Sequence, residues 1–186
     1  MSRFKIFSTP IDELKIIERQ ELCDSRGSLS RLFCAEEIAA AGWLTTVSQI
    51  NHSVTHKLGT VRGMHYQLPP HNETKLVACL KGSVWDVAVD LRFESPTFLK
   101  WHALELSASN HLSLLIPNGF AHGFQALSDE CELIYLHSCA YAAGFEAGIN
   151  PIDPLLAIKW PLLITQLSDK DKKFPLLDHH FKGLDL

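Results

Sequence analysis

Alternation of apolar and polar residues with a period of two is the strongest pattern along this chain, and it is typical of β-strands. In SVWDVAVDLR, residues 83–92, one face is apolar and the other is partly polar: Trp85, Val87, Val89 and Leu91 against Asp86, Ala88 and Asp90. Similar runs are separated by Gly, Pro, Asn and Ser turn residues: LKIIERQ, TTVSQIN, GTVRGMHYQ, KLVACLKG, FLKWHALELS, HLSLLIP and CELIYLHS. Many short strands at close spacing predict an all-β sandwich or barrel.

Two segments depart from this pattern. AEEIAAAG, residues 35–42, predicts a helix of about two turns that ends at Gly42, because glycine readily adopts the left-handed conformation of a helix stop. Beyond Trp160, LSDKDKKF and DHHFKG are charged, alternate little and follow two prolines. We therefore expect a barrel over about residues 1–160 and a helical or irregular segment over residues 161–186 that packs on this barrel. Both parts belong to one domain, residues 1–186.

Composition narrows the class of protein and of partner. The 186 residues are 46% hydrophobic and 20% charged, which is the balance of one globular domain. The formal net charge of −4 gives no reason to expect a nucleic-acid or anionic-membrane partner. Asp12 and Glu13 interrupt the place where a signal peptide needs an apolar segment. The five cysteines are odd in number and lack CxxC spacing, so we expect reduced thiols in a cytoplasmic protein.

The run GTVRGMHYQ contains a histidine that can carry chemistry. Strict alternation places His65 on one face with Val61, Gly63 and Gln67, opposite a face made by Arg62, Met64 and Tyr66. A histidine at the mouth of a barrel can act as a general base, because its ordinary pKa of about 6.5 is easily tuned. A hydrogen-bonded histidine in the core is the structural alternative.

Four further polar residues lie on or beside neighbouring predicted strands: Lys75, Asp86, His122 and Tyr135. Each alone has a structural explanation, as a solvated strand end, an exposed face, a turn residue and a wall residue respectively. Together with His65, they supply a base, a cation, a carboxylate and a weak acid. This combination favours an active site over a purely structural barrel.

Metal binding is a second possibility for the same histidines. PNGFAHG, residues 117–123, has the P-x-G-x-x-H spacing of a cupin metal motif, whose upstream partner is H-x-H followed by a glutamate. Here the upstream stretch reads His65-Tyr66-Gln67, and Glu73 follows in a loop. Two histidines without a third strong ligand are a poor site for a divalent transition metal. We therefore expect no metal and no cofactor.

The motifs, in their order and spacing, resemble a known family. They include DSRG at residues 24–27, VRGMHYQLPP at 61–70, KLV at 75–77, GSVWDVAVDLR at 82–92, IPNGFAHGF at 116–124 and LSDKD at 167–171. The chain is similar in these motifs to the dTDP-4-dehydrorhamnose 3,5-epimerases, which are metal-free sugar-nucleotide epimerases. The resemblance implies a cupin, or jelly-roll, β-barrel with a short helical or irregular C-terminal segment. It also implies epimerisation at C3 and C5 of a nucleoside-diphosphate 4-keto-6-deoxyhexose, in particular dTDP-4-dehydro-6-deoxyglucose.

The resemblance assigns catalytic roles to four residues. The C4 ketone acidifies the hydrogens at C3 and C5, so that removal of one gives an enolate. His65 matches the family's base, and Asp171 matches the carboxylate that orients its imidazole. Tyr135 matches the acid on the far face of the sugar. Lys75 matches the cation that stabilises the enolate oxygen at C4.

Substrate binding and assembly follow from the same resemblance. Arg26 and Arg62 match the arginines that contact the diphosphate, and Tyr141 matches an aromatic residue near the nucleotide. The remaining expected substrate-binding residues are polar or charged: Gln49, Asn51, Asp86, His122 and Arg31. The resemblance also implies a homodimer, in which the chain around DSRG crosses to the neighbouring subunit and completes its site.

One departure from the family pattern concerns the nucleotide base. Where the family has F-x-E after DxRG, this chain reads Leu29-Ser30-Arg31. A carboxylate suits the N3–H donor of thymine, whereas an arginine suits the acceptors of cytosine. Our hypothesis is that the base preference is relaxed or shifted towards CDP.

Three other functions remain open from the sequence. The chain could epimerise only C3 or only C5, or act as a 3,4-ketoisomerase on a CDP- or dTDP-linked 4-keto sugar. It could also be a cupin that binds sugar nucleotides without turning them over.

Overall fold

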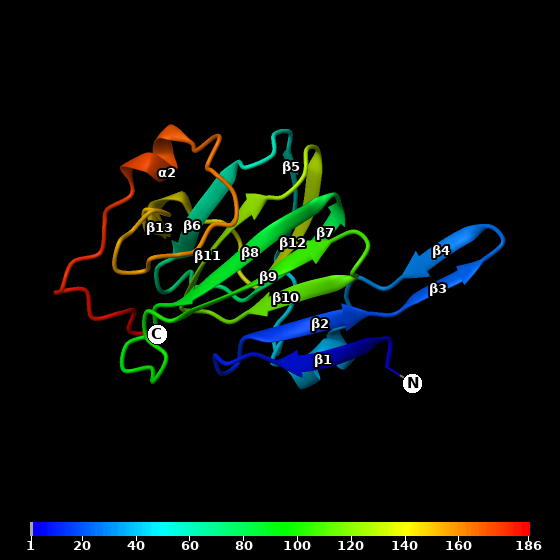
Figure 1. The fold of residues 1–186 in the computed structure, drawn as a ribbon. Coiled ribbons are helices and arrows are strands. Elements are labelled where there is room, and N and C mark those ends of the chain that lie inside the picture. The colour runs from blue at the N-terminus through cyan, green and yellow to red at the C-terminus, as the bar shows by residue number, and fades with distance from the viewer. Residues whose placement is uncertain (1) are drawn as a thin grey trace.

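Two antiparallel sheets packed face to face make up most of the structure, a computed structural model that describes residues 2–186 (Figure 1). The first sheet has the order β1-β2-β10-β7-β12-β5: β1 (Phe4–Ser8), β2 (Lys15–Arg19), β5 (Gln49–Thr55), β7 (Lys75–Lys81), β10 (Leu112–Ile116) and β12 (Cys131–His137). The second has the order β13-β6-β11-β8-β9: β6 (Val61–Gln67), β8 (Ser83–Asp90), β9 (Trp101–Ser107), β11 (Phe120–Ala126) and β13 (Glu146–Gly148). The predicted all-β jelly roll is confirmed, although its sheets do not close into a continuous barrel.

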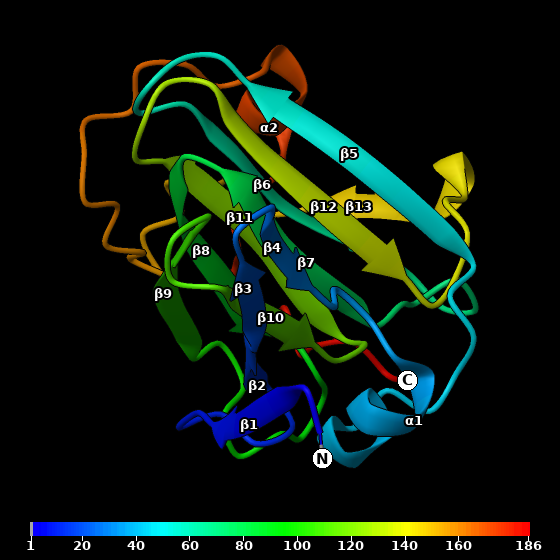
Figure 2. The same cartoon turned by 90° about the vertical axis from the view of Figure 1, so that its right-hand side faces the viewer.

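A separate hairpin carries the DSRG motif. Strands β3 (Glu21–Asp24) and β4 (Gly27–Ser30) pair only with each other and extend away from the two sheets (Figures 1 and 2). Leu22 and Leu29 face each other across this hairpin, and Leu29 is 72% exposed. The hairpin therefore presents apolar side chains outside the body of its own chain.

The main core lies between the sheets. Val77 and Leu133 of the six-stranded sheet pack there with Val84 and Phe124 of the five-stranded sheet. On the outer face of the six-stranded sheet, a second cluster is covered by α1 (Ala35–Ile38), the 3-10 turn η1 (Ala39–Ala41) and Trp43. This short helical segment ends at Gly42 with φ +107°, as the sequence predicts.

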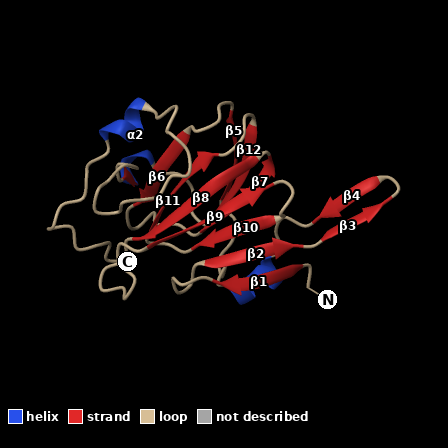
Figure 3. Cartoon of the chain, in the orientation of Figure 1, coloured by secondary structure: helices blue, strands red, loops and turns tan. Residues whose placement is uncertain are grey.

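The outer face of the five-stranded sheet is covered by the chain that follows β13. Val87 and Val89 of β8 pack there against Ile149, Leu156 and Leu184. This segment is mostly loop, apart from the helix α2 (Asp169–Lys173) (Figure 3). No helix within residues 2–186 has the length and apolar character needed to cross a membrane.

Burial of both faces of β8 corrects one structural interpretation from the sequence. An exposed polar face would put Asp86 in water, but its side chain is fully buried. The apolar face of the strand turns outward and is covered by the C-terminal segment, so the partly polar face points between the sheets. Alternation identified the two faces correctly and could not indicate which of them faces the interior.

Candidate active site

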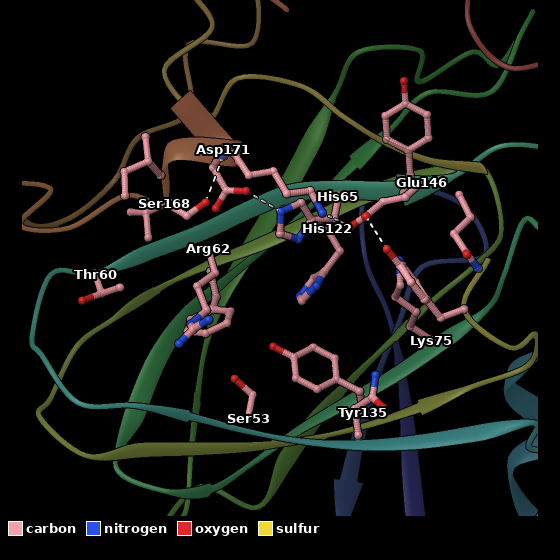
Figure 4. A pocket seen from close by; sticks show the side chains of 18 of the residues that line it. Ser53, Thr60, Arg62, His65, Lys75, His122, Tyr135, Glu146, Ser168 and Asp171 are labelled. Carbon is pink, nitrogen blue, oxygen red and sulfur yellow. Dashed lines mark hydrogen bonds and ion pairs between the residues drawn. The ribbon is translucent and has the colours of Figure 1, made fainter. Parts of the chain in front are cut away.

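A cavity of about 1290 Å³ opens between the sheets. Strands β5, β7 and β12 line it from one sheet, β6 and β11 from the other, and residues 164–168 and 170–172 of the C-terminal segment complete its wall (Figure 4). Backbone hydrogen bonds tie this segment to the strands, from Thr165 N–H to Gly59 O at 3.0 Å and from Val61 N–H to Gln166 O at 3.0 Å.

A β-bulge on β6 determines which of its side chains reach the cavity. His65 pairs with His122 of β11, and Arg62 pairs with Phe124, so three steps along β6 oppose two steps along β11. The extra residue shifts the alternation, and both Arg62 and His65 line the cavity. The prediction that they lie on opposite faces was therefore wrong.

Glycine is required at the bulge. Gly63 has φ +133°, and a Cβ there would lie 2.5 Å from the Cα of Gly123 on the neighbouring strand. Both the backbone conformation and the close approach of the two strands exclude a larger residue.

His65 is held by a carboxylate that is distant in the sequence. Its Nε2 donates to Asp171 Oδ1 at 2.7 Å, and the N–H of Gly63 lies 3.4 Å from Oδ2. Asp171 sits in α2, whose N-terminus is capped by the hydroxyl of Ser168, which accepts from Asp171 N–H at 3.0 Å. Burial alone would raise the pKa of Asp171, but hydrogen bonds, above all from His65, outweigh burial and lower it.

The ionised carboxylate of Asp171 determines which ring nitrogen of His65 carries the proton. With the Nε2 proton directed at Asp171, Nδ1 is left as the acceptor. The side chain of His65 is about one-third exposed, so the imidazole remains accessible from the cavity. The arrangement is that of a general base with a fixed tautomer.

Tyr135 enters the cavity from the opposite sheet (Figure 4). Its ring packs edge-on against His122 at 5.9 Å and stacks on His137 at 6.0 Å between centroids. Burial, followed by the nearby charge of Asp86, raises the pKa of Tyr135 far above its usual value, so the phenol stays protonated. His122 Nε2 contacts both carboxylate oxygens of Asp86, at 3.0 and 2.9 Å, and Asp86 lies behind it rather than on the cavity surface.

The cavity contains two differently placed cations near its centre. Lys75 Nζ forms an ion pair with Glu73 Oε1 at 2.9 Å, and both side chains are buried. Arg62 is exposed, and its Nε and one Nη donate to Thr55 Oγ1 and Val54 O at 3.0 and 3.1 Å. Within residues 2–186, no carboxylate forms an ion pair with Arg62. Its charge is therefore available to an anionic ligand.

Comparison with known proteins identifies the family. A family model described as dTDP-4-dehydrorhamnose 3,5-epimerase matches residues 8–179. The chain belongs to the dTDP-4-dehydrorhamnose 3,5-epimerase family. The resemblance found from the sequence motifs is thereby confirmed.

Individual relatives agree with this assignment. The dTDP-4-dehydrorhamnose 3,5-epimerase of Shigella flexneri is 44% identical over 167 residues, which cover 89% of this chain and 92% of that protein. The crystal structure of the dTDP-6-deoxy-D-glucose-3,5-epimerase from Legionella pneumophila Philadelphia 1, in complex with dTDP-4-keto-L-rhamnose, matches with a TM-score of 0.91 and 39% identity, covering 98% of this chain and 99% of that one. A dTDP-4-dehydrorhamnose 3-epimerase from Streptomyces niveus is 38% identical over 162 residues, which cover 87% of this chain and 78% of that protein.

In this member of the epimerase family, most of the residues that the motifs single out meet at the cavity. Eight of them line it: His65, Tyr135, Asp171, Lys75, Arg62, Asn51, His122 and Tyr141. Gln49 lies just behind the surface, where its Oε1 accepts from Tyr141 N–H at 2.9 Å and its Nε2 donates to Asn51 Oδ1 at 3.0 Å. The hydroxyl of Tyr141 donates to Glu146 Oε2 at 2.7 Å.

Besides Gln49 and Asp86, which lie behind the cavity surface, two predicted arginines lie away from the cavity of this epimerase chain. Arg26 is at the tip of the β3–β4 hairpin, where it is exposed and paired with Asp24 at 2.6 Å. Arg31 forms an ion pair with Glu37, whose pKa is lowered to about 2, first by the backbone N–H of Arg3 and then by Ser2. Within one chain, neither arginine contacts the site.

Motif matching missed six Glu, Lys and His residues that line the cavity: His52, Glu73, His137, Glu146, Lys170 and Lys172. Alternation could have found His137, because it follows Tyr135 by two positions on the same strand. Glu146 and Lys170 form an ion pair that links β13 to α2. Within residues 2–186, no three His, Cys, Asp or Glu side chains gather in a cluster that could hold a metal ion.

Proposed function

We propose that this protein is an isomerase that epimerises C3 and C5 of dTDP-4-dehydro-6-deoxyglucose and thereby produces dTDP-4-dehydrorhamnose. The observation that carries the proposal is the His65–Asp171 pair, with His65 and Tyr135 entering one cavity from opposite sheets. Inversion of a carbon next to a ketone needs a base on one face and an acid on the other, and His65 and Tyr135 supply these two groups. Family membership gives independent support.

The proposed reaction proceeds through an enolate. Nδ1 of His65 takes the proton from the carbon, and Asp171 stabilises the imidazolium that forms. The electron pair moves onto the C4 oxygen, where Lys75 stabilises the negative charge. Tyr135 then donates its proton to the opposite face of the carbon. The C-terminal segment, residues 161–186, thereby completes the active site through Asp171.

Solvent isotope exchange tests this proposal. Incubation of the enzyme with the dTDP-linked 4-keto sugar in D2O should place deuterium at both C3 and C5, as read by NMR and mass spectrometry. Deuterium at one carbon only would replace the proposal with single-site epimerisation, for which the match to the Streptomyces niveus 3-epimerase is the supporting observation. Binding without any exchange would identify a non-catalytic sugar-nucleotide-binding protein.

Replacement of Tyr135 separates the two proton transfers. Tyr135→Phe should retain removal of the substrate proton, seen as exchange with solvent, and should slow inversion at the same carbon. The reason is that His65 and Asp171 are untouched, while the acid on the far face is lost. Loss of exchange and inversion together would assign Tyr135 a different role.

The diphosphate is proposed to meet two arginines that come from different parts of the assembly. Arg62 supplies an unpaired cation inside the cavity, whereas Arg26 is carried by the projecting hairpin. We propose a homodimer in which each hairpin brings Arg26 to the partner's cavity. The exposed Leu29 supports a contact outside the chain. Light scattering should give a dimer mass, and Arg26→Ala should raise KM more than it lowers kcat; a monomer with full activity would exclude this arrangement.

The hypothesis of a shift in base preference rests on Arg31. Its guanidinium is committed to Glu37 within its own chain, so the shift towards CDP gains no support from this contact. Turnover of dTDP-, CDP- and UDP-linked substrates should be compared directly. Equal or better turnover of the dTDP substrate would remove the CDP hypothesis.

A cytoplasmic location is a further proposal. All five cysteines are free thiols, and Cys79 and Cys131 are buried, which suits a reducing compartment. Cell fractionation tests it, and recovery with the periplasmic or secreted fraction would overturn it.

A further inference from the structure

A chain of hydrogen bonds crosses three neighbouring strands at the cavity. Asn51 Nδ2 on β5 lies 3.3 Å from His137 Nε2 on β12. His137 Nδ1 lies 2.9 Å from Glu73 Oε2, and Glu73 Oε1 lies 2.9 Å from Lys75 Nζ on β7. His137 is also the cross-strand neighbour of Lys75 in the β7–β12 register. The four residues line the cavity together and end at the cation next to Tyr135.

The hydrogen bonds in this chain have one consistent direction. Asn51 Oδ1 accepts from Gln49 Nε2 at 3.0 Å, which leaves Asn51 Nδ2 as a donor to His137 Nε2. An imidazole that accepts at Nε2 carries its proton on Nδ1 and donates it to Glu73. Glu73 therefore accepts from His137 with one oxygen and from Lys75 with the other.

Burial makes this arrangement rigid. The side chains of Lys75, Glu73 and His137 are 9%, 8% and 11% exposed. Burial by itself would raise the pKa of Glu73, but the hydrogen bond from His137 and the charge of Lys75 outweigh it and lower the pKa. Glu73 is thus an ionised carboxylate held by two donors.

We infer that Glu73 and His137 are positioning residues for Lys75: Glu73 fixes the ammonium group, and His137 fixes Glu73. The inference rests on the proposed function, in which Lys75 stabilises charge at the C4 oxygen. A lysine has a flexible four-carbon stem, and its ammonium group has three donors. One donor is used by Glu73, which leaves two for the substrate. Stabilisation of a developing oxyanion is strong only when the donor is already in place.

Glu73→Gln tests the inference because an amide cannot complete the chain. If its oxygen accepts from Lys75, its NH2 group faces the Nδ1–H of His137, and two donors meet. Moving the histidine proton to Nε2 only transfers the same conflict to Asn51. We expect kcat to fall about 10- to 100-fold, because a misplacement of roughly 1 Å costs about that much, while KM changes less than about threefold. Unchanged kcat would overturn the inference.

Glu132→Gln is the matched control. Glu132 joins Lys81 and His52 on the same three strands, at 3.4 and 3.1 Å, and of these three residues only His52 lines the cavity. We expect its kcat and KM to equal those of the wild type. An equal fall of kcat in both variants would mean that loss of any such carboxylate disturbs the sheet, and would overturn a specific role for Glu73.

A second pair of variants decides the question if Glu73→Gln does not fold. His137→Asn keeps a donor near the position of Nδ1, whereas His137→Leu has a similar shape and no donor. We expect kcat to fall several-fold or more in His137→Leu and to be largely retained in His137→Asn, at similar KM. Equal kcat in the two variants would overturn the inference.

Failure of the proposed function has a different signature. In that case the wild-type protein shows no exchange at C3 or C5 in D2O. The inference fails separately when the wild type is active and the variants keep its kcat.

Discussion

Two clusters, each made of one glutamate, one lysine and one histidine, lie at opposite ends of the paired strands β7 and β12 and differ in their exposure to solvent. The inner cluster is Glu73, Lys75 and His137, and the outer cluster is Glu132, Lys81 and His52. In the outer cluster the side chains of Glu132, Lys81 and His52 are 31%, 58% and 54% exposed, against about 10% in the inner one. Exposed ion pairs are screened by solvent and salt and contribute little to the free energy of folding. A buried pair holds both side chains in place, and removal of one partner destabilises the protein strongly. Position on the strand, more than composition, therefore separates Lys75, the proposed catalytic lysine, from the surface lysine Lys81.

The largest contrast between an ion pair of the cavity and one of the outer surface is expected at histidine. His65→Ala should lower kcat roughly a hundred- to ten-thousand-fold, the usual contribution of a general base. His56→Ala is the control, because His56 pairs with Glu130 at 3.1 Å on the exposed surface. Steady-state kinetics on the dTDP-linked substrate measures both. A fully active His65→Ala enzyme would remove the assignment of the base.

The two lysines provide the next contrast. Lys75→Met should lower kcat about 100- to 1,000-fold, as the loss of one oxyanion donor does, whereas Lys81→Met should leave kcat within about twofold of wild type. The same kinetic assay measures both variants. Similar losses in the two variants would show that the inner cluster has no special place in the reaction.

Stability should separate the two glutamates. At pH 7, Glu73→Gln should lower the free energy of unfolding by about 3–5 kcal/mol, because it leaves Lys75 buried without its partner. Glu132→Gln should cost at most about 1 kcal/mol. Urea unfolding followed by circular dichroism measures both values. Equal losses would mean that burial does not distinguish the clusters.

The loss of stability in Glu73→Gln should depend on pH in a definite direction. The pKa of Glu73 is lowered from its usual 4.5 in the folded state. The charge of Glu73 contributes its full stabilisation when the pH is above the pKa of Glu73 in the unfolded state. This stabilisation is lost as the pH falls through the lower pKa of Glu73 in the folded state. The difference in free energy of unfolding between the wild type and Glu73→Gln should therefore become smaller below about pH 4.5. A constant difference between pH 7 and pH 3 would contradict the lowered pKa.

The sequence predicted the strands well and their relation to the core less well. Alternation located β8 and its two faces, yet the direction of Asp86 depended on the C-terminal segment that covers Val87 and Val89. On β6, the bulge at Gly63 shifts the alternation by one residue. A bulge depends on the partner strand, so a single strand's pattern does not contain it.

Within the candidate site, long motifs were more informative than isolated residues. LSDKD identified Asp171 as the partner of His65 although 106 residues separate them, because the resemblance supplied the pairing. Glu73 was considered only as a loop residue outside a metal motif, since its role depends on the cross-strand neighbour His137. Arg26 and Arg31 could not be placed by motif alone, because their position depends on how the hairpin and the segment after it leave the sheets.

The separation of His65 from Asp171 also matters during protein synthesis. A domain generally folds as one unit, and its N-terminal residues are synthesised first. His65 is made 106 residues before its carboxylate, so the strands that carry the imidazole can pair before the group that fixes its tautomer exists. In a ribosome-bound chain that stops short of Asp171, part of the outer face of the five-stranded sheet would be uncovered, and His65 would lack its carboxylate partner. Epimerase activity in a nascent chain should therefore appear late and abruptly, once α2 has been translated and has docked.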